Sequence, residues 1–112
     1  MKRGDIYYAN LSPVMGSEMG KRRPVLIVSN NVNNSAGSTV TILPLTSNVS
    51  RVYPFEVLLN PEVSGLTKPS KVQAQQVRTI SKQRITGEVL NSLNEDMMVL
   101  IDGALKLHLG LV

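Results

Sequence analysis

The chain has 112 residues, of which 42% are hydrophobic, a formal net charge of +4 at pH 7, and no cysteine. This length suits one domain, residues 1–112, whose core forms without disulfides or metal, and the composition is too apolar for a disordered protein. The absence of cysteine excludes disulfide frameworks and thiolate metal sites, and it permits a reducing cytosol.

The N-terminal segment predicts a strand followed by a loop. Its first residues, MKRGDIYYANLSP, contain two cations, but Gly4, Asp5 and Asn10 interrupt any apolar stretch. We therefore predict neither a signal peptide nor a membrane span, and we expect a cytoplasmic protein. Residues 5–11 are rich in β-forming side chains, and the next stretch, SPVMGSEMGKR, carries two glycines that favour a loop.

Apolar runs separated by turn residues predict further strands. PVLIVSN is a continuous apolar run, typical of a strand buried on both faces, and it stops at NNVNNSAGS, which predicts a turn. Pro44 indicates that its strand ends near a sheet edge or a bulge, and residues 61–69 predict a loop. KVQAQQV alternates as a half-buried strand does. The predicted strands are residues 5–11, 24–30, 39–45, 55–59, 71–77 and 85–90.

The C-terminal segment changes period and predicts one helix from residue 93 onward. Asn94 is a suitable N-cap, with Leu93 and Met98 as a hydrophobic staple, although Ser92 and Glu95 also fit a capping box. Several short strands with one terminal helix predict a small, mainly β, barrel-like domain. The predicted apolar face of the helix comprises Met97, Leu100, Ile101, Ala104, Leu105 and His108.

The positive charge lies in the body of the chain. Residues 1–87 contain 11 Lys or Arg against 4 Asp or Glu, whereas residues 88–112 contain one Lys against four acids. If folding joins the two basic clusters, they form a surface suited to a polyanion; the alternative is that they only keep the domain soluble. The clusters are Lys2, Arg3, Lys21, Arg22 and Arg23, and then Lys68, Lys71, Arg78, Lys82 and Arg84.

The residue inventory excludes several kinds of catalysis. With His108 as the only histidine and no cysteine, the chain offers no zinc site, no Ser-His-Asp triad and no pair of imidazoles. No glycine-rich nucleotide-binding motif is present. An enzyme built from this sequence would work with arginine, hydroxyls, amides and one carboxylate at most, which suits a phosphodiester better than an amide or a sugar.

Arg23 stands at the entrance to the buried run. Pro24 disfavours the helical region for the residue before it, so Arg23 is held extended at the edge of a rigid strand. A guanidinium binds phosphate through paired hydrogen bonds and remains charged. The alternative is a structural ion pair between Arg23 and Asp5 or Glu18.

The motifs RGDIYY, GSE, RPV, LPLTS, YPFEV and QQVRT occur in this order. In this combination the sequence resembles the MazF/PemK family of toxin-antitoxin ribonucleases from Arg3 to the terminal helix. The resemblance implies a mainly β (α+β) fold, a small SH3-like β-barrel with a C-terminal α-helix, and a homodimer. It also implies metal-independent cleavage of single-stranded RNA without a cofactor, and a partner antitoxin whose flexible acidic tail occupies the RNA groove.

The resemblance implies that Arg23 and Thr46 are catalytic. In RNA cleavage without metal, the 2′-oxygen attacks the adjacent phosphate, and the products are a 2′,3′-cyclic phosphate and a 5′-hydroxyl. Arg23 would stabilise the added negative charge, and the Thr46 hydroxyl would donate to the same group. Taken without the family, Thr46 and Ser47 are equally typical of turn residues at a strand end. The general base stays open, because arginine is a poor base and Glu18 is only well placed in sequence.

The remaining predicted site residues are assigned to RNA binding. Gln76 offers a donor and an acceptor to a base edge, the cations offer phosphate contacts, and Tyr53 offers a ring for stacking, although Tyr53 and Phe55 also suit barrel packing. Met19, the Lys21-Arg22 pair and Gln75 depart from the family pattern in the binding loops, which leaves the cleavage sequence open. The RNA-binding set is Ser17, Glu18, Lys21, Arg22, Ser47, Tyr53, Ser70, Gln76 and Arg78.

Two other functions remain as alternatives. A non-catalytic RNA-binding barrel would show the same basic body, but such modules rely on several stacking aromatics, and this chain has only Tyr7, Tyr8, Tyr53 and Phe55. A gyrase inhibitor of the CcdB type shares the fold but depends on a tryptophan near the C-terminus, and this chain has no tryptophan.

Overall fold

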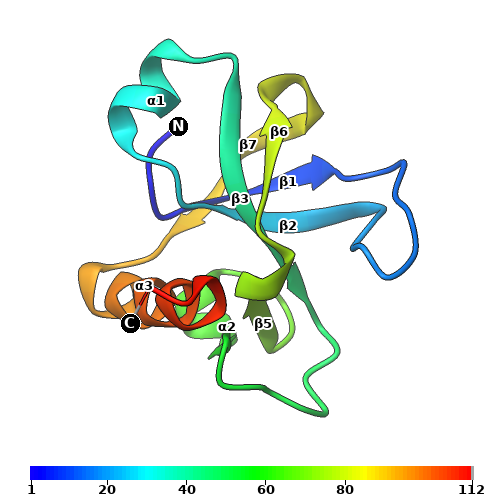
Figure 1. Cartoon of the computed structure of the whole chain (residues 1–112), viewed down its shortest axis with the longest axis vertical. Coiled ribbons are helices and arrows are strands. Elements are labelled where there is room, and N and C mark those ends of the chain that lie inside the picture. Colours follow the sequence, from blue (N-terminus) through cyan, green and yellow to red (C-terminus); the bar gives the residue numbers. More distant parts are fainter. Residues whose placement is uncertain (112) are drawn as a thin grey trace.

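A computed structural model describes residues 1–111, and Val112 lies outside the described part. Figure 1 shows strands at the centre of the molecule, with the long C-terminal helix packed to one side. The strands are β1 (Asp5–Asn10), β2 (Arg22–Ile27), β3 (Thr39–Thr46), β4 (Glu56–Leu59), β5 (Ser70–Gln73), β6 (Arg78–Ser81) and β7 (Ile85–Ser92). The helices are α1 (Asn31–Ala36), α2 (Pro61–Ser64), α3 (Glu95–Leu109) and the 3₁₀ turns η1 (Ala74–Gln76) and η2 (Lys82–Arg84).

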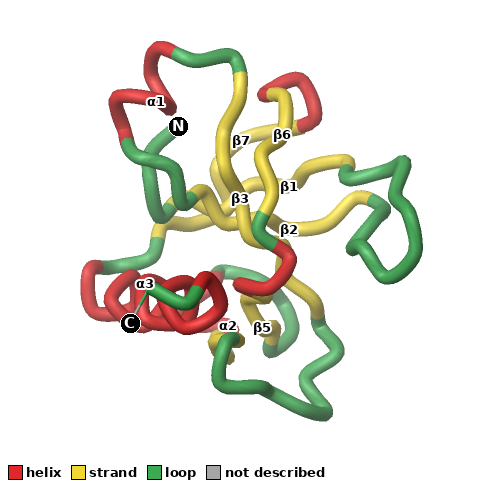
Figure 2. The backbone as a smooth tube through the Cα atoms, in the orientation of Figure 1, coloured by secondary structure: helices red, strands yellow, loops and turns green. Residues whose placement is uncertain are grey.

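The strands form one antiparallel sheet, and this sheet is open. Within residues 1–111 the order is β4-β5-β3-β2-β1-β7, and β6 pairs with β3 beside this path. The mainly β class with a C-terminal helix is confirmed, and the expected small SH3-like barrel is not closed, because no pairing joins the outer strands β4 and β7. Figure 2 shows the two long loops, residues 11–21 and 47–55, projecting away from the strands.

The central strands are buried on both faces, as the continuous apolar run of β2 predicts. Leu26 and Leu43 belong to a core that α3 covers, whereas Val25, Ile27 and Ile42 belong to a second core on the other face. Alternate side chains of a strand point to opposite faces, so two cores require apolar residues at every position. This burial holds the start of β2 and the end of β3 in fixed positions.

Pro44 lies inside β3, within the predicted strand 39–45, and is buried. One edge of β3 pairs with β6 at residues 39–42 and with β5 at residues 45–46, and Pro44 falls between these stretches. A proline lacks the N–H that a ladder requires. It is therefore accommodated at the point where β3 changes partners.

Two loops and one strand of the prediction are corrected. Residues 31–36 form helix α1 where a turn was predicted, capped by the Asn30 side chain, and Pro61–Ser64 form helix α2 within the predicted loop. The predicted strand 71–77 ends at Gln73, because the turn η1 carries the chain from β5 to β6.

Helix α3 begins as predicted, with the Asn94 side chain accepting from the backbone N of Met97 at 2.9 Å. Its buried residues are Met98, Ile101 and Ala104, with Met97 and Leu105 packed against the same core. Leu100 and His108 were predicted to lie on the apolar face, but both are exposed and lie outside the buried face.

Candidate active site

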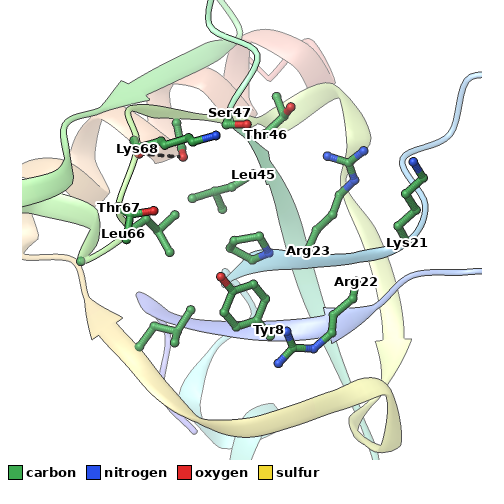
Figure 3. A pocket seen from close by; sticks show the side chains of 14 residues that line it. Tyr8, Lys21, Arg22, Arg23, Leu45, Thr46, Ser47, Leu66, Thr67 and Lys68 are labelled. Atoms are coloured by element: carbon green, nitrogen blue, oxygen red, sulfur yellow. Dashed lines mark hydrogen bonds between the residues drawn. The ribbon is translucent and has the colours of Figure 1, made fainter.

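A pocket of about 390 Å³ opens where the strand ends meet the connection between α2 and β5. Figure 3 shows Arg23 and Lys21 at one end of it and Leu66, Thr67 and Lys68 at the other. The lining residues are Tyr8, Lys21, Arg22, Arg23, Pro24, Leu45, Thr46, Ser47, Gly65, Leu66, Thr67, Lys68, Ser70 and Leu90. Six of the predicted site residues therefore share one pocket: Lys21, Arg22, Arg23, Thr46, Ser47 and Ser70.

The two predicted catalytic residues lie on neighbouring strands at matching heights. Strands β2 and β3 are antiparallel, with Val25 opposite Pro44. Extending this register by two residues aligns Arg23 with Thr46, and both line the pocket. Because side chains at opposed positions of neighbouring strands point to the same face, the guanidinium and the hydroxyl are directed to the same space.

Arg23 makes no ion pair within residues 1–111. Its Nε donates to the carbonyl oxygen of Gly20 at 2.7 Å, which fixes the plane of the guanidinium, and its outer nitrogens make no hydrogen bond within this range. Asp5 accepts instead from Ser92 Oγ at 2.6 Å and from the backbone N of Lys2 at 2.9 Å. The structural ion pair with Asp5 or Glu18 is therefore wrong, and the charge of Arg23 faces the pocket uncompensated.

Thr46 ends β3 at the rim of the pocket, and Ser47 follows it. The Thr46 Oγ1 accepts from the backbone N of Asn48 at 3.2 Å, which leaves its proton available to a ligand. Thr46 therefore takes part in the turn that follows β3 and also lines the pocket. Ser70 opens β5 and is buried, and its hydroxyl donates to the carbonyl of Lys68 at 3.2 Å.

A buried ion pair lies beside Thr46, on the neighbouring strand β5. Lys71 stands directly opposite Thr46 in the pairing of β3 with β5, and its Nζ lies 2.9 Å from Oε1 of Glu56. Burial raises the pKa of Glu56, but hydrogen bonds from Tyr53 N, Gln75 and Lys71, together with the charge of Lys71, outweigh it, so the pKa is lowered. Lys71 also donates to the carbonyl of Arg51 at 2.7 Å. These contacts fasten the loop that follows Thr46.

Tyr53 lies outside the pocket lining, although the sequence assigned it to RNA stacking. Its ring is stacked on Phe55, with centroids 5.5 Å apart, and the guanidinium of Arg51 and the ammonium of Lys71 lie over it at 5.6 and 5.8 Å. The ring therefore has contacts within the chain, but Tyr53 keeps 42% of its surface exposed, so neither barrel packing nor RNA stacking is decided for it.

Three predicted RNA contacts do not line the pocket: Ser17, Glu18 and Gln76. Their hydrogen bonds hold the loop 11–21 in its conformation. The Gln76 amide bridges the loop, accepting from Met19 N at 3.2 Å and donating to the carbonyl of Ser17 at 3.4 Å. The Glu18 carboxylate accepts from Met15 N at 2.7 Å. Gln76 also lies in η1 and not on the strand where it was predicted.

The basic clusters meet only in part. Arg78 donates to the carbonyl of Leu11 at 3.2 Å and stays outside the lining, and Arg84 donates to the carbonyls of Asn10 and Ser12 at 3.1 and 2.6 Å. Arg78 and Arg84 of the second basic cluster thus stabilise the loop 11–21, which carries Lys21 of the first basic cluster. The cations in the pocket itself are Lys21, Arg22, Arg23 and Lys68, whereas Lys71 is paired with Glu56 and Arg3 with Asp102.

Sequence reasoning missed the other half of the pocket. Tyr8, Leu66, Thr67 and Leu90 line it, and none of them was assigned to the site. Leu90 reaches the pocket because β7 bulges from β1: Tyr7 alone stands opposite residues 87–90. The sequence carried one signal for this half, Lys68 in the second basic cluster.

The structure adds no metal-binding cluster: in the part of the chain that it describes, no group of three or more His, Asp or Glu is placed to hold an ion. None of the helices within residues 1–111 has the length and apolar character needed to cross a membrane.

Known proteins resemble this chain both in sequence and in fold. Residues 2–109 match the family described as PemK-like, MazF-like toxin of type II toxin-antitoxin system. The chain is 38% identical to Endoribonuclease MazF9 of Mycobacterium tuberculosis, covering 99% of this chain and 98% of the relative. It is 37% identical to Endoribonuclease EndoA of Bacillus subtilis, covering 100% of this chain and 97% of the relative.

Solved structures with the same fold have similar lengths. A MazF from Deinococcus radiodurans superposes with a TM-score of 0.84 at 29% identity, covering 98% of this chain and 96% of that one. An endoribonuclease in complex with its cognate antitoxin, from Mycobacterial species, superposes with a TM-score of 0.81 at 30% identity, covering 100% of this chain and 97% of that one.

Proposed function

Because this chain belongs to the PemK-like, MazF-like toxin family of type II toxin-antitoxin systems, we propose that it is a toxin that cleaves single-stranded RNA at short specific sequences. The relatives named endoribonuclease cover nearly the whole chain and support this activity.

The observation that carries the proposal is that Arg23 and Thr46 line one pocket, at positions that the extended register of β2 and β3 aligns. An uncompensated guanidinium beside a free hydroxyl proton suits the phosphoryl group of RNA, because both donors can bind the same oxygen atoms. Lys21 and Lys68 line the same pocket and add positive charge for neighbouring phosphates.

In the proposed reaction the 2′-hydroxyl gives up its proton to solvent water as its oxygen attacks the adjacent phosphorus. The bond from phosphorus to the 5′-oxygen breaks, and that oxygen takes up a proton from water, so no net proton is lost or gained. The products are a 2′,3′-cyclic phosphate and a 5′-hydroxyl. Arg23 stabilises the negative charge that develops on the phosphoryl oxygens, and the Thr46 hydroxyl donates a hydrogen bond to the same oxygens. A preorganised donor of this kind contributes about 3 kcal/mol, or at least about a hundredfold in rate. The charge of Arg23 supplies this stabilisation, so we propose cleavage without a metal ion.

We assign no general base. The side chains that line the pocket within residues 1–111 include no carboxylate and no imidazole, and Glu18 binds Met15 in its own loop. The reaction therefore depends on charge stabilisation and on holding the 2′-oxygen in line with the leaving oxygen.

The proposal includes partners for the toxin. The Mycobacterial relative, solved in complex with its cognate antitoxin, supports a cognate antitoxin for this chain, whose acidic tail would compete with RNA for the cationic pocket. We also propose a homodimer and a cytoplasmic location, where the RNA substrate is found. The exposed Val99, Leu100 and Leu107 of α3 offer apolar surface for contact between subunits.

The test is incubation of the purified, antitoxin-free protein with a long transcript in EDTA. We expect discrete fragments with 5′-hydroxyl ends, and no fragments from Arg23→Ala. Retention of RNA without cleavage would favour the non-catalytic barrel, and inhibition of gyrase with intact RNA would favour the CcdB-like function. Loss of cleavage in EDTA with recovery on adding a divalent cation would contradict metal independence alone.

A further inference from the structure

The proposed chemistry leaves the apolar half of the pocket unused. Pro24, Leu45, Leu66 and Leu90 line the pocket between Arg23 and Lys68, and they have no part in charge stabilisation. Leu90 keeps 37% of its surface exposed. An open apolar surface beside a phosphate site is suited to an apolar group that is covalently joined to a phosphate.

Tyr8 forms the wall of this half, and its neighbours hold the ring in place. It stands opposite Pro24 in the pairing of β1 with β2, and the guanidinium of Arg22 lies 4.2 Å from the ring centroid. Arg22 is fixed in turn, because its Nε donates to Thr86 Oγ1 at 3.3 Å. A cation over the ring face attracts the ring electrostatically. The orientation of Tyr8 is therefore set before any ligand arrives.

The hydroxyl of Tyr8 is directed into the pocket (Figure 3) and makes no hydrogen bond within residues 1–111. Thr67, at the far side of the same pocket, brings a second hydroxyl. The apolar half thus combines flat hydrophobic walls with two polar groups at its margin.

We propose that this half of the pocket binds one nucleobase of the RNA strand next to the cleaved phosphate, and that Tyr8 is a residue that determines which base is accepted. This inference rests on the proposed ribonuclease function. A nucleobase has two apolar faces and a polar edge, so its faces pack against Pro24 and the leucines while its edge meets the hydroxyls of Tyr8 and Thr67. A phosphate does not suit these walls, because Pro24 and the leucines offer it no hydrogen-bond donor in exchange for its hydration.

Lys68 lies at the rim of the pocket, where it can bind a second phosphate of the same RNA strand. Figure 3 places it at the opposite end of the pocket from Arg23, with the apolar walls between them. An RNA strand that sets one phosphate at Arg23 and one base between the walls can bring a further phosphate to Lys68. Base contacts specify the sequence, and phosphate contacts set the position of the strand.

The test compares Tyr8→Phe with Tyr7→Phe. Both substitutions remove one phenolic hydroxyl from β1, but Tyr7 packs against the second core and does not line the pocket, so it is a matched control. Each protein is incubated with the same long transcripts, and the fragment ends are sequenced to give the nucleotide preference at every position around the cleavage point. Rates on short oligonucleotides that differ at one position then give the ratio of kcat/KM between bases.

We expect Tyr8→Phe to reduce discrimination at one position beside the cleavage point by about three- to tenfold, the value of one neutral hydrogen bond. Preferences at the other positions should stay as in the wild type, and Tyr7→Phe should keep the whole pattern. Thr67→Val should reduce discrimination at the same position as Tyr8→Phe.

An unchanged preference in Tyr8→Phe, or a uniform loss of rate at all sites, would overturn the nucleobase site while the ribonuclease function stands. Intact transcripts with the wild-type protein would overturn the ribonuclease function, and the nucleobase site with it. A changed preference in both tyrosine variants would show a general disturbance of β1 and would also overturn the assignment to Tyr8.

Discussion

The Nζ atom of Lys71 lies 2.9 Å from Oε1 of Glu56, and the two side chains keep only 9% and 1% of their surfaces exposed. The same carboxylate accepts from the backbone N of Tyr53 at 2.9 Å and from Gln75 Nε2 at 2.7 Å. The pair therefore joins β4, β5 and the loop that follows Thr46. Its role is to hold that loop in place, and its strength depends on the charge of Glu56.

Replacing Glu56 with glutamine should destabilise the protein at neutral pH. The ammonium of Lys71 would remain buried without an opposite charge, which costs about 3–5 kcal/mol and lowers the thermal midpoint by at least about 10 °C. Differential scanning calorimetry measures this shift. Glu88→Gln, an exposed position on β7, is the control and should leave the midpoint unchanged. An unchanged midpoint in Glu56→Gln would contradict a stabilising role for the pair.

The free energy of unfolding should depend on pH through the ionisation of Glu56. Its pKa is lowered from the ordinary value of 4.5, so the folded state favours the carboxylate, and the resulting stability is present above that value. It is lost as pH falls below 4.5 through the lower pKa of the folded state. The difference in free energy of unfolding between wild type and Glu56→Gln should therefore narrow as pH falls. Urea titrations across this range measure it, and a constant difference would contradict the prediction.

Arg23→Ala should remove cleavage and leave stability nearly unchanged. Arg23 has no ion pair within residues 1–111, and its hydrogen bond to Gly20 lies at the surface of the pocket, so few stabilising contacts are lost. The rate should fall at least about a hundredfold. Initial rates on a fluorescent oligonucleotide and thermal midpoints measure the two effects. Arg51→Ala, outside the pocket, is the control for charge, and a large loss of stability in Arg23→Ala would restore a structural role.

Substitutions at Thr46 should separate its hydroxyl from its shape. Thr46→Val keeps the branched side chain but loses the donor, so we expect the rate to fall about tenfold or more, the value of a hydrogen bond to a charged group. Thr46→Ser keeps the hydroxyl and should remain within about threefold of the wild type. The same oligonucleotide assay measures both. Equal rates for Thr46→Val and Thr46→Ser would show that the hydroxyl does not take part.

Gln76→Ala should loosen loop 11–21 without unfolding the sheet. The lost amide bridges Met19 N and the carbonyl of Ser17, so the loop should open more often. Hydrogen exchange at Met19 should become up to about tenfold faster, and trypsin should cut sooner after Lys21. Gln83→Ala, an exposed glutamine in η2, is the matched control. Exchange as slow as in the wild type would show that the bridge does not restrain the loop.

The parts of the fold that follow from hydrophobic period were predictable from the sequence. The unbroken run of Val25, Leu26 and Ile27 indicated a strand buried on both faces, and the spacing of apolar residues with Asn94 indicated α3 and its start. The alignment of Arg23 with Thr46 was not predictable from the pattern alone, because it depends on the register between β2 and β3.

Polar contacts account for most of what was missed. Helix α1 is held by the Asn30 side chain, which accepts from Asn33 N at 2.8 Å, and by Asn34, which is buried and donates to the carbonyl of Ser29 at 2.8 Å. A sequence of asparagines carries no apolar period that would reveal these bonds. Gln76 offered an amide suited to a base, but its partners lie more than fifty residues away in sequence and decide its role.

The role of Tyr8 was hidden for a different reason. Tyr7 and Tyr8 are adjacent, similar in type and both half-buried, so the sequence does not say which faces the core and which the pocket. The open sheet was also not predictable from the sequence. It depends on the change of pairing partner of β3 at Pro44, and that change involves strands far away in the sequence.

The complete burial of Val25, Leu26 and Ile27 has a consequence for how β2 finds its place. If the strand slides by one residue, each aliphatic side chain is exchanged for another, so the middle of β2 cannot distinguish a correct alignment from an incorrect one. The flank must do so. A slip in one direction would put the guanidinium of Arg23 where Pro24 now stands opposite Tyr8. The register of β2 is therefore specified by the residues that flank its aliphatic run, Arg23 and Pro24 among them.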